Sequence, residues 1–326
     1  MRKYWNLCLL FGFFLTLVAG SNPAFAEDFQ GWLAAVRAEA KAAGVSDNVL
    51  RQAFPPEMKP DAVVLRLDRK QPEKTKSLAK YLSDILTPRM IRQARQHYAE
   101  NKALLDEIGR QYRVDPALIV ALWGIETNFG ANTGNFDVVT SLATLAYDGR
   151  RGAYFRQELI NALKMLEQSR MKDKHLRGSW AGAMGQIQFM PSTFLKYAQD
   201  HNRDGLRDIW GAKGDIFASA AFYLSSIGWT YGAPWGDEVH LPKGFNRNYL
   251  GLDKKYSLQF WKDAGVRLKS GKPLPFTGNY LVSIIQPDGE RGTVYVIYEN
   301  YHSILVWNKS TYFATAVSLL MDRIKA

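Results

Sequence analysis

Residues 116–130 read PALIVALWGIETNFG, and this stretch predicts a buried helix. Residues 116–125 carry no charge, and Asp115 followed by Pro116 is a typical start for a helix that runs to about residue 128. Glu126 then places a carboxyl near the end of an apolar helix. Because burial disfavours the charged form of a carboxyl, Glu126 is a candidate general acid. The alternative is a helix-end glutamate that meets water or an arginine.

A second informative stretch, at residues 178–192, reads GSWAGAMGQIQFMPS. Its glycines and alanines permit close approach of the backbone to a ligand. Two glutamines bring amides, while Trp180, Phe189 and Met190 bring apolar surface. Amides beside aromatic faces suit sugar rings, which are polar at the rim and apolar on the face. The alternative is a tight crossing between two helices with aromatic residues in the core.

The rest of the chain predicts an α+β fold with a dominant helical body. Apolar spacing or capping signals indicate helices over residues 29–40, 46–54, 78–86, 90–105, 153–168, 193–198, 216–227 and 311–324. Residues 280–285 and 293–298 are rich in β-branched and aromatic side chains, with a Pro-Asp-Gly turn between them. We therefore expect a small β-rich part near the C-terminal end.

Composition narrows the class of protein. The 326 residues are 47% hydrophobic and 22% charged, which is typical of a folded chain. A single cysteine excludes a disulfide framework and a cysteine-based zinc site. The net charge of +11 suits an anionic partner such as nucleic acid, acidic lipid or cell-wall polymer. The five histidines are scattered, and the basic residues lack a recognition helix, so nucleic-acid binding is poorly supported.

Residues 1–26 are interpreted as a secretory signal. Arg2 and Lys3 precede an uncharged apolar run over 7–18, and residues 24–26 read Ala-Phe-Ala, a small-x-small cleavage site. The alternative is a membrane anchor, although the run is short for a span. Cys8 lies too early for a lipoprotein signal. We expect an exported periplasmic protein with no membrane span after cleavage and no nucleic-acid partner.

Four motifs together resemble the lytic murein transglycosylase B family (glycoside hydrolase family 103). They are residues 121–130, residues 141–148 (SLATLAYD), residues 181–192, and Asn308-x-Ser310. The likeness covers essentially the whole mature chain in order. It implies a mainly helical lysozyme-like core with an N-terminal α part and a small C-terminal β-rich subdomain. The expected segments are a signal peptide (1–26), the N-terminal part (27–112), the catalytic core (113–236), the β-rich subdomain (237–306) and a returning helix (307–326).

The resemblance also implies a function and a set of site residues. The family cleaves the β-1,4 bond between N-acetylmuramic acid and N-acetylglucosamine in the glycan strands of peptidoglycan, and it needs no cofactor for catalysis. Glu126 falls on the family's catalytic acid. The family's cleft positions fall on Ser179, Gln188, Phe189, Met190, Tyr223 and Asn308. Trp307 and Phe313 stand where we expect tyrosines, so hydroxyl contacts at these two positions are in doubt.

The recognised motifs hold one carboxylate, so the same group is expected to act as acid and then as base. Glu126 would protonate the glycosidic oxygen and then take the proton of the C6 hydroxyl, which attacks C1 of its own sugar. The Asn308 amide is a candidate to stabilise the charge that develops on the ring. Alternatives are a lysozyme-type hydrolase of the same bond and a non-catalytic peptidoglycan-binding protein. We expect a monomer.

A calcium site is predicted after residue 199. Asp200, Asn202, Asp204 and Gly205 match the start of an EF-hand loop, in which alternate side chains supply oxygens and glycine makes the sharp turn. The twelfth position, which needs glutamate in an ordinary loop, is Gly211. A lengthened loop of the family implies further oxygens from Asp208, Asp215 and the carbonyl of Leu206. The alternative is a polar, solvated loop without a metal.

Overall fold

The computed structural model describes residues 28–70, 76–168, 176–275 and 280–326. The predicted signal peptide at 1–26 lies outside the described residues. Two compact units are present: the first unit comprises the described residues of 28–70 and 126–223, and the second comprises those of 76–125 and 224–326. The predicted α+β class with a dominant helical body is confirmed. The finer segment boundaries stay a prediction.

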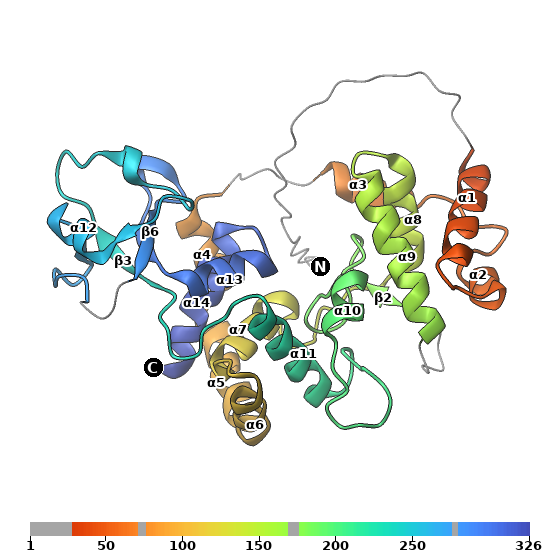
Figure 1. The fold of residues 1–326 in the computed structure, drawn as a ribbon, viewed down its shortest axis with the longest axis horizontal. Coiled ribbons are helices and arrows are strands. Elements are labelled where there is room, and N and C mark those ends of the chain that lie inside the picture. Colours follow the sequence, from red (N-terminus) through yellow and green to blue (C-terminus); the bar gives the residue numbers. More distant parts are fainter. Residues whose placement is uncertain (1–27, 71–75, 169–175, 276–279) are drawn as a thin grey trace. The chain divides into compact units, whose positions relative to one another are not determined.

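The first unit is built around two long helices. Helix α8 (Val138–Asp148) and helix α9 (Gly152–Gln168) lie side by side (Figure 1). Helices α1 (Phe29–Ala42), α2 (Asp47–Ala53) and α10 (Pro191–Tyr197) pack on α9, and α3 (Ala62–Arg69) packs on α8. Most of α11 (Lys213–Ser226) also belongs to this unit.

Side-chain caps and a buried ion pair fix the first unit locally. Ser46 caps α2, which falls within the helix predicted over 46–54, and Asp137 caps α8 by accepting from the Thr140 N–H at 2.8 Å. Asp68 at the end of α3 is only 2% exposed and pairs with Arg150 at 2.6 Å and Arg151 at 2.7 Å. Burying a carboxylate is costly unless it is paired or hydrogen-bonded, so these ion pairs stabilise the contact of α3 with the turn between α8 and α9.

A short two-stranded sheet lies at the start of the stretch 178–192. Strand β1 (Phe136–Asp137) pairs antiparallel with β2 (Arg177–Gly178), and Phe136 lies opposite Gly178. The sheet therefore fixes where residues 178–190 begin, directly beside the start of α8.

The second unit contains the apolar helix α7 (Pro116–Thr127) up to residue 125. The predicted cap is confirmed, since Asp115 Oδ1 accepts from the Ala117 N–H at 2.9 Å, and residues 117–122 are all fully buried. Helices α4 (Leu78–Ile85), α5 (Pro88–Glu100) and α13 (Glu299–Trp307) contact α14 (Thr311–Lys325), and α6 (Lys102–Tyr112) packs on α5.

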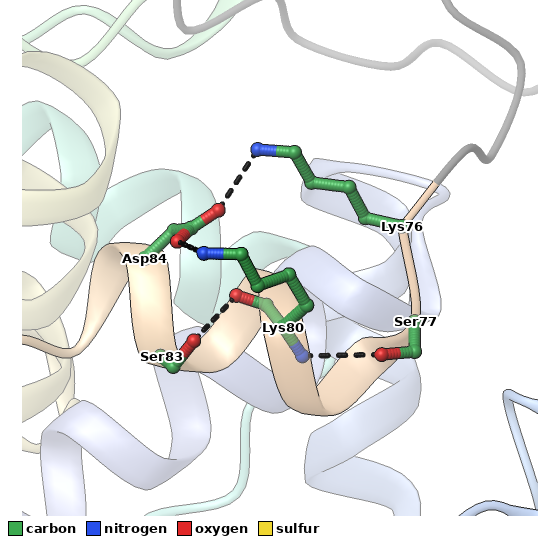
Figure 2. Close-up of polar contacts among 5 residues, drawn as sticks. All are labelled: Lys76, Ser77, Lys80, Ser83 and Asp84. Atoms are coloured by element: carbon green, nitrogen blue, oxygen red, sulfur yellow. Dashed lines mark hydrogen bonds and ion pairs between the residues drawn. The ribbon is translucent and has the colours of Figure 1, made fainter.

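Helix α4 shows how a short helix begins and is held at the surface. Ser77 Oγ accepts from the Lys80 N–H at 3.3 Å, and Ser83 Oγ donates to the Lys80 carbonyl at 2.8 Å (Figure 2). Asp84 forms ion pairs with Lys76 and Lys80, which are exposed and contribute little to stability. The helix is retained mainly because it buries Leu78 and Ile85.

The second unit also contains a five-stranded antiparallel sheet in the order β4-β6-β7-β3-β5. Its strands are β3 (Gly236–His240), β4 (Tyr256–Ser257), β5 (Arg267–Leu268), β6 (Leu281–Ile285) and β7 (Val294–Ile297). Helix α12 (Leu258–Asp263) contributes Trp261, which is fully buried with Ile284 and Val296 in the core of the sheet. Short 3-10 turns at Arg247–Tyr249 and Gly289–Arg291 complete this part.

Helices α3, α12 and α13 were not predicted from the sequence, and one predicted helix is divided. The continuous helix expected over 90–105 is wrong, because the chain breaks at Asn101 between α5 and α6. The Asn101 side chain donates to the His97 carbonyl at 2.7 Å and so ends α5. Among the described helices, none combines the length and apolar character that crossing a bilayer requires.

Candidate active site

Glu126 is the second-to-last residue of α7 and belongs to the first unit. Its predicted burial is confirmed, since the residue is only 7% exposed. Thr127 beside it is 1% exposed. A buried carboxyl at the end of a helix is a candidate proton donor to a bound group.

The loop after α7 turns back through an unusual backbone path. Asn128, Phe129 and Gly130 have consecutive positive φ angles of 50°, 58° and 86°. Thr127 Oγ1 accepts from the Gly130 N–H at 3.0 Å and donates to the Gln186 carbonyl at 2.7 Å. The residue that follows Glu126 is therefore bonded directly to the stretch 178–190.

The stretch 178–190 is held in shape by its own backbone. The Ser179 N–H donates to the Ala183 carbonyl at 2.7 Å, and the Ala183 N–H donates to Ser179 Oγ at 3.1 Å. Met184 and Phe189 exchange two backbone hydrogen bonds of 2.8 and 3.0 Å. Ser179 and Phe189, both predicted cleft residues, thus lie in two adjoining closed turns, at residues 179–183 and 184–189.

The side-chain amides of both glutamines in this loop donate hydrogen bonds to backbone carbonyls. Gln186 Nε2 donates to the Trp210 carbonyl at 2.6 Å. Gln188 has a φ of 51°, and its Nε2 donates to the carbonyls of Thr133 at 3.1 Å and Gly185 at 2.9 Å. Hydrogen bonds therefore join the glycine-rich loop (the stretch 178–190) both to the loop after α7 and to the segment near residue 210.

The glycines of this region are required by close packing. A Cβ on Gly134 would lie 2.1 Å from the Gly178 carbonyl oxygen, and a Cβ on Gly185 would lie 2.7 Å from the Ile209 carbonyl oxygen. Side chains do not fit such gaps without movement of the backbone. The small residues thus permit close approach between loops of the protein itself. From the sequence they were expected to permit close approach of the backbone to a ligand.

Aromatic residues complete this part of the first unit. The ring of Phe189 meets Tyr223 of α11 edge to face at 5.6 Å, and Tyr223 lies 4.5 Å from Tyr197. Burial raises the pKa of Tyr223 to about 12, so its phenol stays neutral at physiological pH. Met190 is 6% exposed and precedes α10. The structure therefore brings Ser179, Gln188, Phe189, Met190 and Tyr223 together in one unit with Glu126.

Sequence reasoning missed Glu158, another buried carboxyl of the first unit. It lies on α9, is 4% exposed, and accepts from Ser192 N at 2.9 Å and Ser192 Oγ at 2.6 Å. Burial raises its pKa, while the two hydrogen bonds act in the opposite direction. The sequence contained a signal for this burial. Glu158 is three residues after Phe155 and one before Leu159, so helical spacing places it on the apolar face of the helix.

Asn308 belongs to the second unit, where it ends α13 and is 3% exposed. Its Oδ1 accepts from the Ser310 N–H at 3.0 Å, and Ser310 in turn caps α14. Asn308 and Ser310 of the sequence motif therefore shape the turn between these two helices. A role for Asn308 toward a glycan stays a prediction, as does the significance of Trp307 and Phe313.

The predicted calcium loop has an ordered backbone in the structure. Asp200 accepts from the N–H groups of Asp204 at 3.1 Å and Gly205 at 2.9 Å, and Gly205 has a φ of 86°. Asp215 is fully buried and accepts from the N–H groups of His201 and Asp208, each at 2.8 Å. Throughout the part of the chain that the structure describes, no three His, Cys, Asp or Glu side chains are grouped to hold a metal.

The chain is similar to several known proteins. It is 31% identical over 245 residues to membrane-bound lytic murein transglycosylase B of Escherichia coli K12, which covers 73% of this chain and 64% of that protein. The match thus spans less than two thirds of the relative's length.

Solved structures of lytic transglycosylases are also similar to this chain. SltB3 from Pseudomonas aeruginosa, in complex with NAG-anhNAM-pentapeptide, matches with a TM-score of 0.87 and 41% identity over 92% of this chain and 80% of that one. The lytic transglycosylase Slt35 of E. coli, in complex with calcium, matches with a TM-score of 0.76 and 28% identity over 89% and 91% of the two chains.

The model of the transglycosylase SLT domain family matches residues 28–322, nearly the whole described chain. The expected mainly helical, lysozyme-like fold is confirmed by these matches. The chain therefore belongs to the transglycosylase SLT domain family, and the resemblance to lytic murein transglycosylases seen in its motifs is confirmed.

Proposed function

We propose that this chain is a peptidoglycan lytic transglycosylase that cleaves the β-1,4 bond between N-acetylmuramic acid and N-acetylglucosamine. It would leave 1,6-anhydromuramoyl ends on the glycan strand. Membership of the family supports the reaction class. The relative SltB3 was crystallised with NAG-anhNAM-pentapeptide, which contains an anhydro sugar of this kind.

One structural observation supports the assignment most directly. Glu126 is a buried carboxyl beside a loop that is hydrogen-bonded to the stretch holding Ser179, Gln188 and Phe189. A proton donor with these neighbours suits a glycosidic oxygen, because the amide of Gln188 can orient the sugar hydroxyls.

In the proposed reaction Glu126 first gives its proton to the leaving glycosidic oxygen. The C–O bond breaks, and positive charge develops on the ring of N-acetylmuramic acid. Glu126 is then ionised and removes the proton from the C6 hydroxyl of the same sugar. The C6 oxygen attacks C1, so no water is consumed and the carboxyl ends the cycle protonated.

The intramolecular nucleophile explains why a single carboxyl suffices. Most glycosidases need a second carboxylate to act as nucleophile or to activate water. A hydroxyl on the reacting sugar has a high effective concentration when the ring is held in a suitable conformation. Holding that ring is the role we assign to Gln188, Phe189 and Met190.

The substitution Glu126→Gln tests the assignment. It keeps the size of the side chain but removes the transferable proton, so turnover of purified sacculi should fall by at least about 10³-fold. The fold should persist, as measured by circular dichroism and melting temperature. Glu100→Gln is the matched control, because Glu100 also ends a helix but is exposed. Near-normal release of muropeptides by Glu126→Gln would disprove the role.

Mass spectrometry of the products separates this reaction from that of a lysozyme-type hydrolase. Anhydro ends lie about 18 Da below hydrolysed ends, the mass of one water molecule. A non-catalytic binding protein would bind sacculi and release no soluble fragments. Export to the periplasm, expected from residues 1–26, would place the enzyme beside this polymer.

We also propose that the loop at 200–208 holds a calcium ion. The oxygens of Asp200, Asn202 and Asp204 alternate along it, and Gly205 has the positive φ that the sharp turn of such a loop needs. Asp208, Asp215 and the Leu206 carbonyl are the further candidate donors, a set of oxygens that calcium prefers. Slt35, which is similar to this chain, was crystallised with calcium. The ion would brace a loop adjoining Trp210, whose carbonyl holds Gln186.

A further inference from the structure

We propose that Glu158 is a positioning residue for the predicted cleft residues Gln188, Phe189 and Met190, and that it acts through Ser192. The inference rests on the proposed function, because it assigns a role toward the same glycan. Glu158 lies on α9, while the segment that it would position immediately precedes α10.

The start of α10 lacks the usual local cap. Met190 occupies the N-cap position and forms no side-chain cap hydrogen bond, and Pro191 has no N–H to donate. The first backbone donor of the helix is therefore Ser192 N–H. Glu158 accepts that N–H at 2.9 Å and the Ser192 hydroxyl at 2.6 Å, so a side chain from another helix replaces the missing cap.

The other end of the same segment is also fixed. Met184 and Phe189 exchange backbone hydrogen bonds, which close the loop between them. Gln188 and Phe189 thus lie within this closed loop, and only Met190 and Pro191 separate it from the Glu158 contact at residue 192. Because Gln188 adopts a positive φ of 51°, its backbone needs support from the surrounding structure.

The chemistry of Glu158 argues for a role beyond filling space between α9 and α10. An apolar side chain would pack there without the cost of burying a carboxylate. Among the described residues Glu158 forms no ion pair, and burial raises its pKa. Burial, and after it the carboxylate of Glu158, raises the pKa of Tyr154, to which Tyr223 also contributes. A buried, costly group next to the predicted cleft is more consistent with precise placement than with packing.

The test compares Glu158→Ala with the conservative Glu158→Gln. Alanine removes both acceptors, whereas a glutamine amide can accept from Ser192 N–H and donate to its hydroxyl. We expect Glu158→Ala to raise KM for purified glycan strands about tenfold, with kcat per folded molecule changed less than about threefold. Glu158→Gln should restore KM to within about threefold of the wild type.

Two further variants distinguish positioning from general destabilisation. Asn300→Ala removes a buried amide that holds Thr230 and Ala233 in the second unit, so it should lower the melting temperature without changing KM. Ser192→Ala should raise KM about threefold, and it should add nothing to Glu158→Ala, because both act through one contact. If Glu158→Ala does not fold, the KM of Ser192→Ala is measured in its place.

The inference is overturned if Glu158→Ala keeps the wild-type KM, if Asn300→Ala raises KM equally, or if folded Glu158→Gln gives no rescue. Calorimetric binding of NAG-NAM-pentapeptide keeps this outcome separate from the proposed function. An inactive wild type would refute the function, while weaker binding by Glu158→Ala with recovery in Glu158→Gln would still support the positioning role. Unchanged binding across the series would refute it.

Discussion

Thr127 Oγ1 donates a hydrogen bond of 2.7 Å to the carbonyl oxygen of Gln186. The two residues are far apart in the sequence, and this contact joins the end of α7 to the middle of the glycine-rich loop. Since Thr127 directly follows Glu126, the position of the proposed acid depends on the loop that we propose holds the sugar. The two parts of the site cannot move independently without breaking this bond.

Replacing Thr127 by valine should therefore impair both stability and turnover. The isosteric change leaves the Gln186 carbonyl and the Gly130 N–H without their partner, which should lower the free energy of unfolding by about 2 kcal/mol. Misplacement of Glu126 should lower kcat about tenfold. Chemical denaturation and steady-state kinetics on glycan strands measure the two effects.

Thr144→Val is the matched control. Thr144 is fully buried, donates to the Thr140 carbonyl at 2.7 Å and accepts from the Asp61 N–H at 2.9 Å. It should cost similar stability and leave kcat per folded molecule unchanged. An equal loss of kcat in both variants would contradict a specific role for the Thr127 contact.

Gly134→Ala should be far more harmful than Gly44→Ala. Both glycines have φ near 90°, so an alanine at either position costs about 1–2 kcal/mol in backbone strain. At Gly44 nothing lies within 4 Å of the new Cβ, whereas at Gly134 the Gly178 carbonyl oxygen would lie 2.1 Å away. The difference between their melting temperatures isolates the clash. If the two variants melt alike, the close approach of these loops is not retained in solution.

The helix break at Asn101 shows where sequence periodicity is insufficient. Apolar spacing continues from 90 to 105, so it predicts a single helix. A hydrogen bond from the Asn101 side chain to the His97 carbonyl lies at the break, and such an interaction competes with helix propagation. Capping was predictable at Ser46 and Asp115, because serine and aspartate before an apolar helix act through their immediate neighbours.

The pH dependence of stability should carry a contribution from Glu158. Its pKa in the folded protein lies above the ordinary value of 4.5, so the native state binds the proton more tightly than the unfolded chain. This contribution is fully present below pH 4.5 and is lost as pH rises through the raised pKa. Glu158→Gln removes the titration, so the stability difference between wild type and variant should shift in favour of the variant as pH rises.

Denaturation of both proteins from pH 4 to pH 8 measures this difference. Parallel curves for wild type and Glu158→Gln would show that Glu158 titrates alike in the folded and unfolded states. Glu167→Gln serves as the control, because its carboxylate accepts from the exposed Ser46 N–H and lies outside the apolar core.

Calcium should raise the melting temperature if the loop at 200–208 binds it. A ligand present at 100 times its Kd stabilises a protein by about 2.7 kcal/mol. We expect the melting temperature to rise with calcium and to return to its starting value after addition of a chelator. Asp204→Ala should abolish the response. A melting temperature that does not respond to millimolar calcium in the wild type would exclude the site.

The candidate site was only partly predictable. Glu126 and the stretch 178–192 were found because an uncharged helix and a run of small residues are visible in one sequence. The positive φ angles of Asn128, Phe129 and Gln188 were not, since none is glycine and their conformations are imposed by contacts across the fold. Glu158 lay on a predicted apolar stripe, but only the coordinates identify Ser192 as its partner.

The double attachment of residues 184–192 also limits how the proposed enzyme can diversify. Insertions are usually tolerated in surface loops. This segment is fixed by backbone pairing at one end and by Glu158 at the other, so it cannot accommodate an added residue without breaking one of these contacts. One added residue would rotate Phe189 away from Tyr223 or detach Ser192. Altered glycan preference is therefore more accessible by exchanging side chains at 188 and 190 than by lengthening the loop.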